Sequence, residues 1–242
     1  MADAPMYAGT SGFAYPSWKP EFYPKNVPSA KFLSFYATRL NAVEANYTYR
    51  RIATANVFEK WIASTPHGFL FLPKAHVRIT HILKLDGAED FTRYFLESLE
   101  PLRSAGRLGP ILMQLAPAFK ADLPRLSSFV RLLPANARFA FEFRHPSWFE
   151  EPVFTCLRDH NIGLCLAENE KLETPSVLTA DFVYLRLRKP DYSSDEIREI
   201  AGRIKSYRDA GRTVYAILKH EETPAGALNA EKLLNTSNST LP

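Results

Sequence analysis

Charged side chains follow short apolar segments of this chain. The segment Phe139–Phe143 reads Phe-Ala-Phe-Glu-Phe, and Arg144 and His145 come directly after it. Because side chains alternate between the two faces of a strand, the three phenylalanines share one face, whereas Glu142 and Arg144 share the other. Burying a charge costs free energy unless it is paired, so an apolar strand that turns ionic only at its end indicates a candidate site.

Five other segments end in the same way, in side chains that can bind a ligand or exchange a proton. These residues are Glu44, Asn46, Lys74, Gln114, Arg186, Arg188, Lys219 and His220. Glu44 and Glu142 have the chemistry of a general acid and base, which glycoside hydrolysis also uses. Lys74 could form a Schiff base, or it could simply pair with one of the glutamates.

These residues carry more positive than negative charge. Glu44 and Glu142 face the basic side chains of Lys74, Arg144, Arg186 and Lys219. Cations that outnumber carboxylates predict a small anionic ligand, a phosphate or a carboxylate, with Gln114 orienting it. The same cations lower the pKa of both glutamates, which suits a base better than an acid. The alternative is that the charges pair with one another and only cap the core.

Aromatic side chains and histidines complete the candidate set. Tyr15 and Trp18 stand in an aromatic-rich loop that could stack on a base or sugar ring, or that could pack as a lid. His145 and His220 could contact a substrate, or could have a structural hydrogen-bonding role. We expect no metal and no cofactor, because the chain lacks HxxxH and HExxH spacings, a phosphate-binding glycine loop and a GxSxG turn.

Eight alternations of strand and helix patterns must position these residues. The predicted strands are Met6–Gly9, Ala42–Asn46, Phe69–Pro73, Pro110–Leu115, Arg138–Phe143, Ile162–Ala167, Phe182–Leu187 and Thr213–Lys219. The predicted helices are Ala30–Leu40, Ala55–Ser64, Ala88–Leu102, Leu123–Leu133, Pro152–His160, Asp195–Ala210 and Ala225–Leu234. The sixth unit lacks a full helix, because Glu168–Asp181 is short and polar.

This alternation predicts an α/β fold, a (β/α)8 TIM-type barrel in a single domain over residues 1–235, with a frayed tail at 236–242. A doubly wound open sheet is the alternative, but no GxGxxG follows the first strand. Barrels of this type carry their chemistry where the C-terminal ends of the strands meet the following loops. We call this end the C-terminal mouth, and the ionic side chains fall there.

Composition sets broad limits on function. The 242 residues include 30 basic and 26 acidic side chains, and the formal net charge is +4. This excess permits a nucleic-acid partner, but no run of Lys and Arg indicates one. The two cysteines exclude a disulfide scaffold. We expect a cytoplasmic protein without a signal peptide and without a membrane segment; the sequence leaves its oligomeric state open.

Several motifs together resemble the DUF72 (YecE-like) family. They are Gly9–Gly12 with Tyr15, Trp18 and Phe22–Pro24; Asn41–Asn46 with Thr48 and Tyr49; Lys74 and Ala75 with Arg78–His81; Gly109–Leu115; Phe139–Trp148; Asp181–Arg186; and Lys219 and His220 with Thr223, Pro224, Gly226 and Asn229. The resemblance implies a TIM-type barrel and supplies no established reaction. The chain departs from it at Ala116, where many members have a second proline, and at Leu218–His220, where many have Phe-Asn-Asn.

Three functions follow, in order of preference. The first is an enzyme that acts on a small anionic molecule by general acid–base chemistry at the C-terminal mouth, with hydrolase, lyase and isomerase left open. The second is a barrel that processes or binds nucleic acid, which predicts a steep salt dependence of binding. The third is a non-catalytic scaffold in which the ionic residues form a buried network.

Overall fold

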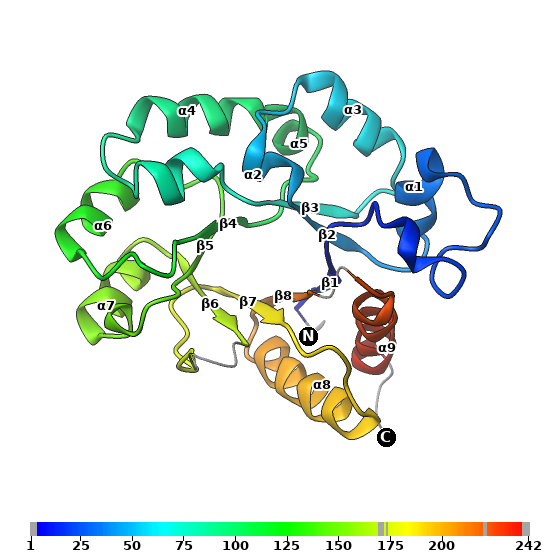
Figure 1. Ribbon diagram of the computed structural model, residues 1–242. Helices are drawn as coiled ribbons and strands as arrows, with labels where there is room; N and C mark the ends of the chain where they lie inside the picture. Colours follow the sequence, from blue (N-terminus) through cyan, green and yellow to red (C-terminus); the bar gives the residue numbers. More distant parts are fainter. Residues whose placement is uncertain (1–3, 169–171, 173, 220–221, 239–242) are drawn as a thin grey trace.

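Eight parallel strands form a ring that is surrounded by helices (Figure 1). The computed structural model describes residues 4–168, 172, 174–219 and 222–238. The strands are β1 (Met6–Ser11), β2 (Ala42–Ala45), β3 (Leu70–Pro73), β4 (Ile111–Gln114), β5 (Phe139–Glu142), β6 (Gly163–Ala167), β7 (Phe182–Leu187) and β8 (Thr213–Leu218). The predicted TIM-type barrel is therefore confirmed.

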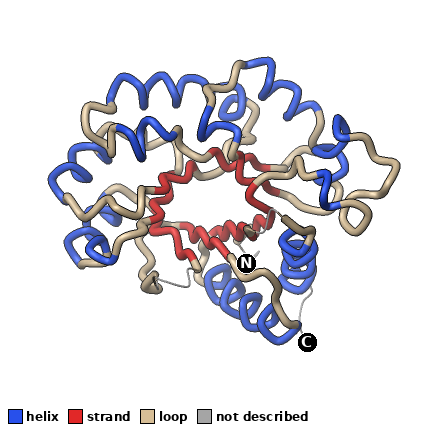
Figure 2. The backbone as a smooth tube through the Cα atoms, in the orientation of Figure 1, coloured by secondary structure: helices blue, strands red, loops and turns tan. Residues whose placement is uncertain are grey.

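The ring closes between β3 and β4. The hydrogen-bonded order of the strands is β3-β2-β1-β8-β7-β6-β5-β4, which leaves these two strands at its ends. Bridges from Phe71 to Leu108 and from Lys74 to Leu112 join them, and the amide of Ala75 donates to the carbonyl of Leu112 over 2.9 Å. Figure 2 shows the resulting ring of strands inside the helices.

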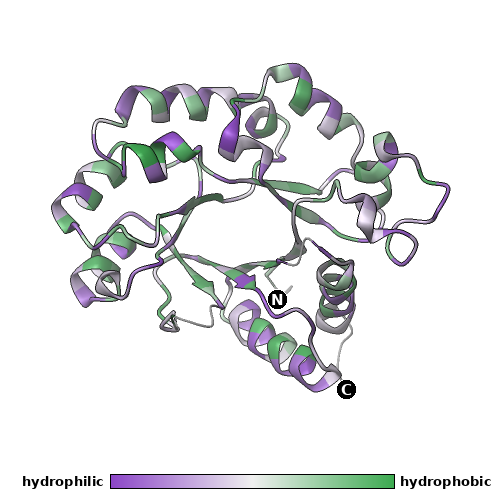
Figure 3. Cartoon of the chain, in the orientation of Figure 1, coloured by the Kyte–Doolittle hydropathy of each residue, from purple (hydrophilic) through white to green (hydrophobic). Residues whose placement is uncertain are grey.

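Helices follow the strands around the outside. The longer ones are α3 (Ala55–Ala63), α4 (Glu89–Ser98), α6 (Leu123–Val130), α7 (Glu151–Asp159), α8 (Ser194–Asp209) and α9 (Ala225–Asn238). The shorter ones are η1 (Pro16–Trp18), η2 (Ser29–Lys31), α1 (Phe32–Tyr36), α2 (Tyr47–Arg50), η3 (Arg78–Ile82), α5 (Glu100–Ser104) and η4 (Pro146–Trp148). Hydrophobic and hydrophilic residues alternate along the outer helices, as expected where one helix face packs on the strands (Figure 3).

Most predicted elements match these bounds, and the differences are local. The predicted helix Ala88–Leu102 is two helices, α4 and α5, with Pro101 in the first turn of the second. Helix α9 runs to Asn238, so Thr236 to Asn238 of the predicted tail are helical. As expected, no helix separates β6 and β7 among the described residues. The one-turn helices α2 and η3 were not predicted, because so few residues show no periodicity.

The alternation of β5 separates two layers of packing. Phe139, Phe141 and Phe143 lie in the core between strands and helices. Ala140, on the opposite face, packs inside the barrel with Leu72, Leu112, Cys165, Tyr184, Tyr215 and Ile217. Both cysteines, Cys156 and Cys165, are buried and form no disulfide. Among the described residues, no helix is long and apolar enough to cross a membrane.

Candidate functional site at the C-terminal mouth

Arg186 is the centre of a buried ionic network. It lies on β7, and its side chain is 1% exposed. One terminal nitrogen donates to Oε1 of Glu44 over 2.7 Å, and the other donates to Oε2 of Glu142. Both carboxylates raise the pKa of Arg186 well above its usual value, against the opposing effect of burial. The structure thus brings together three residues predicted from β2, β5 and β7.

Glu44 is held by donors from two other strands, β1 and β7. Ser11 Oγ at the end of β1 donates to Oε1 over 2.7 Å, and Tyr184 donates its hydroxyl to Oε2 over 2.9 Å. The side-chain nitrogen Nδ2 of Asn46 donates a hydrogen bond to Ser11 Oγ over 2.9 Å. Together with Arg186, these contacts engage both carboxylate oxygens, so Glu44 has a fixed orientation and no contact with solvent.

Glu142 is the second fixed carboxylate. Its Oε2 also accepts from Nε2 of Gln114 over 2.9 Å, and its Oε1 accepts from Arg188. The Nε atom of Arg144 lies 3.8 Å from Oε1. Burial alone would raise the pKa of Glu142, but Arg186, Arg188 and the bond from Gln114 outweigh burial and lower this pKa to about 2. Glu142 is therefore ionised at neutral pH.

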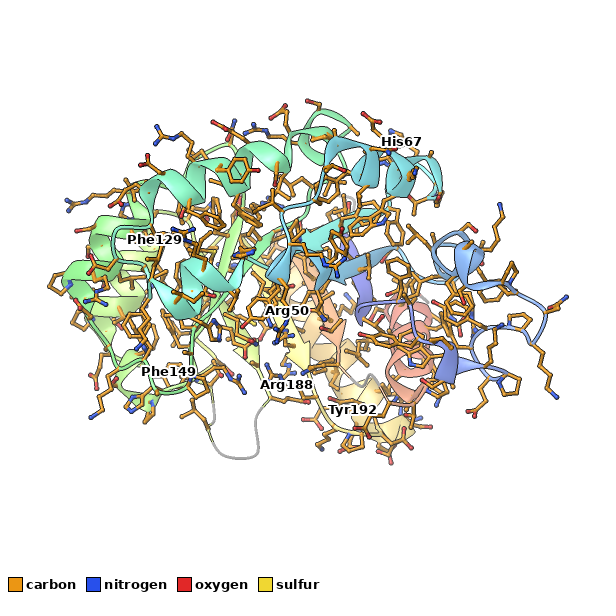
Figure 4. All side chains as sticks on the ribbon, turned by 45° about the horizontal axis from the view of Figure 1, so that its top comes forward. Arg50, His67, Phe129, Phe149, Arg188 and Tyr192 are labelled. Atoms are coloured by element: carbon orange, nitrogen blue, oxygen red, sulfur yellow. The ribbon has the colours of Figure 1, made fainter. Side chains whose placement is uncertain are left out.

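Guanidinium groups at the mouth retain unused donors. The buried Nε atoms of Arg144, Arg186 and Arg188 have no hydrogen-bond partner among the residues that the structure describes. Such orphaned donors are uncommon in native structures and need an explanation. A third carboxylate, Glu168, is occupied by the backbone amide of Arg188 over 2.7 Å and by the hydroxyl of Tyr192. Figure 4 labels Arg188, with Arg50, near the centre of this region, and Tyr192 below them.

Charge at the mouth is unbalanced among the described residues. Three carboxylates, those of Glu44, Glu142 and Glu168, face five cations. The cations are Lys74, Arg144, Arg186, Arg188 and Lys219. A positive excess beside orphaned N–H donors can hold an anion.

Lys74 differs from the arginines, because its amine is not ion-paired. It follows β3, and Thr48 of α2 anchors its carbonyl with a 2.8 Å hydrogen bond. Its Nζ lies 4.3 Å from the centre of the Tyr49 ring, and it makes no hydrogen bond or salt bridge to any residue that the structure describes. Burial is the main cause that lowers the pKa of Lys74 to about 8. The charges of Arg186 and Lys219 add to this effect, and those of Glu44 and Glu142 oppose it.

His81 adds a second titratable group beside Lys74. It belongs to η3, its Nδ1 lies 2.8 Å from Thr80 Oγ1, and its ring meets the ring of Tyr49 edge-on at 5.6 Å. Burial lowers its pKa below the usual value, and the charges of Lys74 and Arg144 lower it further. Its imidazole is therefore neutral at pH 7.

The remaining predicted polar residues are placed less centrally. Lys219 is exposed, and its backbone amide bonds to the carbonyl of Leu187 over 2.8 Å. His145 accepts from the amide of Ser147 over 3.2 Å through Nδ1, and so caps η4. This contact gives His145 a structural role. His220 lies outside the described residues.

The two predicted aromatic contacts belong to the packing instead. Trp18 has no exposed surface, because it packs against Tyr15, Phe22 and Tyr23 in the outer core. It offers no surface to a ligand, so its predicted place at the substrate is wrong for this structure. The ring of Tyr15 lies 4.9 Å from that of Trp18, and its hydroxyl donates to the carbonyl of Ser11 over 2.9 Å. Tyr15 thus positions the end of β1.

Four residues of the site were missing from the predicted set: Ser11, Tyr49, His81 and Tyr184. Strand alternation already placed Tyr184 and Arg188 on the same face as Arg186. Ser11 lies beyond the predicted first strand, which ends at Gly9, whereas β1 runs to Ser11. Tyr49 and His81 come from short helices, which leave no periodic signal.

No metal centre is formed by the residues that the structure describes. Nowhere among them do three or more His, Cys, Asp or Glu side chains converge in a way that could hold a metal ion. At the mouth itself, Glu44 and Glu142 already bind cationic side chains. The donor set therefore suits an anion better than a cation.

Fold and site together define a TIM-type barrel protein with a basic C-terminal mouth built on a buried Glu–Arg–Glu network. A family model described as a protein of unknown function, DUF72, matches residues 7–241. The chain belongs to this family, as the sequence motifs predicted.

Known relatives agree with this assignment. The UPF0759 protein YecE of Escherichia coli strain K12 is 30% identical over 145 residues, which are 60% of this chain and 50% of YecE, so the match spans about half of that relative. A DUF72 family protein from Thermotoga maritima has a crystal structure with a TM-score of 0.85 at 26% identity, covering 96% of this chain and 98% of that one. An AP endonuclease, family 2, from Brucella melitensis shares only the fold, with a TM-score of 0.56 at 10% identity and 96% coverage of both chains.

Proposed function

We propose that this protein is an enzyme that acts on a small anionic molecule, a phosphate or a carboxylate, at the C-terminal mouth. The observation that carries the proposal is the pair of orphaned Nε donors of Arg144 and Arg188 beside the amine of Lys74, which is ion-paired with no described residue. An anion would satisfy donors that the protein itself leaves without partners.

Arg144 is the best candidate for direct contact with the anion. Its nearest carboxylate oxygen is 3.8 Å away, and its side chain is 30% exposed. Arg186, by contrast, is committed to two carboxylates and fully buried. Arg144, Arg188 and Lys219 would hold the anion, while Arg186 fixes the network beneath them.

Two groups have contacts and pKa values that suit proton transfer near neutral pH. Lys74, with a pKa of about 8, has both protonation states populated at pH 7 to 8. His81 is neutral there, and it shares the ring of Tyr49 with Lys74. The contacts favour these two residues over Glu44 and Glu142 for acid–base work, because both glutamates are fully bonded and shielded from solvent. The glutamates become positioning residues in this proposal.

Phosphate binding tests the anion site directly. Calorimetric titration with inorganic phosphate should give saturable binding to the wild-type chain, and Arg144→Ala should weaken it by about tenfold, the effect of losing one charged hydrogen-bonding partner. Arg158→Ala is the matched control. Arg158 is an arginine on α7, which runs back toward the opposite end of the barrel, and it pairs with Glu151. Equal affinities in all three proteins would overturn the proposal.

Turnover tests the enzymatic part. The protein is incubated with mixtures of phosphorylated and carboxylated metabolites, and products are followed by mass spectrometry. The proposal expects at least one anionic compound to be consumed by the wild-type chain and spared by Arg144→Ala. The same proposal places the enzyme in the cytoplasm, a compartment that suits two buried cysteines without a disulfide.

Nucleic acid is the second candidate, and one observation favours it. Directly after α2, the guanidinium of Arg51 lies 5.6 Å from the centre of the ring of Tyr47, the first residue of that helix, which is 39% exposed. Exposed aromatic and basic pairs can stack on bases. Retention on polynucleotide with a steep salt dependence would support this function. Phosphate binding without retention on polynucleotide would favour the small-anion enzyme instead.

A further inference from the structure

We propose that Lys74 forms an imine with the carbonyl group of an anionic aldehyde or ketone, a proposal that rests on the proposed function and narrows its substrate class. In this reaction the Lys74 amine is the nucleophile, and its position is set by β3, α2 and the ring of Tyr49. The acidic group of the same substrate would bind to Arg144 and its neighbouring cations.

The geometry removes the main obstacle to this reaction. A lysine that is ion-paired keeps its proton and is a poor nucleophile. Lys74 lies among Glu44, Glu142 and Arg186, yet both glutamates are bound by Arg186, and neither lies within 4.0 Å of the Lys74 amine. Neither glutamate therefore forms an ion pair with Lys74.

The surroundings also favour the neutral amine. Lys74 is largely buried, and the positive charges of Arg186 and Lys219 oppose its protonation. The face of Tyr49 lies against the amine at 4.3 Å. Burial beside other cations is the established way in which proteins activate a lysine for carbonyl chemistry.

The step balances without any further reactant. The lone pair of Nζ attacks the carbonyl carbon and forms the carbon–nitrogen bond. The carbonyl oxygen then leaves as water, with both protons that the amine gives up. His81, neutral and close to Tyr49, is placed to move one of these protons.

Reductive trapping tests the inference. The wild-type protein is incubated with pyruvate and sodium cyanoborohydride, which delivers a hydride to an imine carbon and leaves a stable secondary amine, and the labelled lysines are then identified by peptide mass spectrometry. We expect labelling at Lys74 to exceed that at the exposed Lys25 and Lys60 by about tenfold near pH 7.5, because far more of a low-pKa amine is neutral there. These two lysines are references within the same folded molecule. Acetone, which has the carbonyl but no charge, should give little labelling.

Two variants separate the possible outcomes. Lys74→Arg keeps the positive charge, so it should still bind phosphate but should lose the trapped product, and Arg144→Ala should reduce trapping with pyruvate. Labelling of Lys74 at the level of Lys25 and Lys60, or equal labelling by acetone and pyruvate, would overturn the inference. If phosphate binding still depends on Arg144 in that case, the proposed function stands without the imine; if phosphate binding is also absent, both fail.

Discussion

The guanidinium of Arg186 donates to Oε1 of Glu44 over 2.7 Å, and the two side chains are 1% and 0% exposed. Arg186 also pairs with Glu142, so a single buried cation neutralises two buried carboxylates from different strands, β2 and β5. Each partner is tolerable inside the protein only while the others are present. The effect of removing one of them therefore depends on which charges are left behind.

Arg186→Met should destabilise the protein by about 3 to 5 kcal/mol, since it leaves Glu44 and Glu142 without their shared cation. Urea unfolding at about pH 7 measures this loss. Replacing all three residues with methionine or leucine should recover most of it, because an apolar cluster of similar volume leaves no uncompensated charge. A triple variant as unstable as the single variant would contradict this explanation.

Stability should fall in acid partly because of Glu142. The pKa of Glu142 is about 2 in the folded protein, below the usual 4.5, so its contribution is complete above about pH 4.5 and is lost as the pH falls through the folded value. The wild-type chain and Glu142→Gln should thus differ most in free energy of unfolding near neutral pH, and the difference should narrow below about pH 4.5. Urea unfolding at several pH values measures it; a constant difference would refute the linkage.

Strand alternation predicted the network but not its function. A period of two is a local property of the chain, so it placed Glu44, Glu142 and Arg186 on inward faces without any knowledge of the fold. Which cation each carboxylate binds depends on distances across the barrel. These distances leave Lys74 unpaired, and no local pattern encodes them. The predicted substrate contact of Trp18 could not be judged from the sequence for a similar reason. The path of its loop determines whether the side chain lies at the mouth or in the outer core, where the structure buries it.

The hydroxyl of Tyr184 should contribute to the orientation of Glu44. Tyr184→Phe removes the 2.9 Å bond to Oε2 but keeps the ring, so it should cost about 1 to 2 kcal/mol in free energy of unfolding. Tyr94→Phe is the control, since Tyr94 is 55% exposed, and we expect a change within about 0.5 kcal/mol. Both values come from urea unfolding at about pH 7, and equal effects would show that the Tyr184 hydroxyl contributes nothing.

Lys74 should lower the free energy of unfolding, as functional residues often do. Its pKa is about 8 in the folded protein against 10.5 normally, so between these values the unfolded chain holds a proton that the folded protein lacks, and stability rises with pH. Lys74→Met should therefore be more stable than the wild-type chain at about pH 7, by about 2 to 3 kcal/mol, since each pKa unit of the shift is equivalent to about 1.4 kcal/mol. The advantage should shrink as the pH rises from about 8 toward 10.5.

Lys25→Met, a substitution of an exposed lysine, is the control and should change little. A Lys74→Met variant that is less stable at pH 7 would mean that the amine makes a stabilising ion pair in solution. An ion-paired Lys74 would keep its proton, and both its proposed acid–base role and the imine would lose their physical basis. Stability against pH thus tests the chemistry of this lysine before any substrate is known.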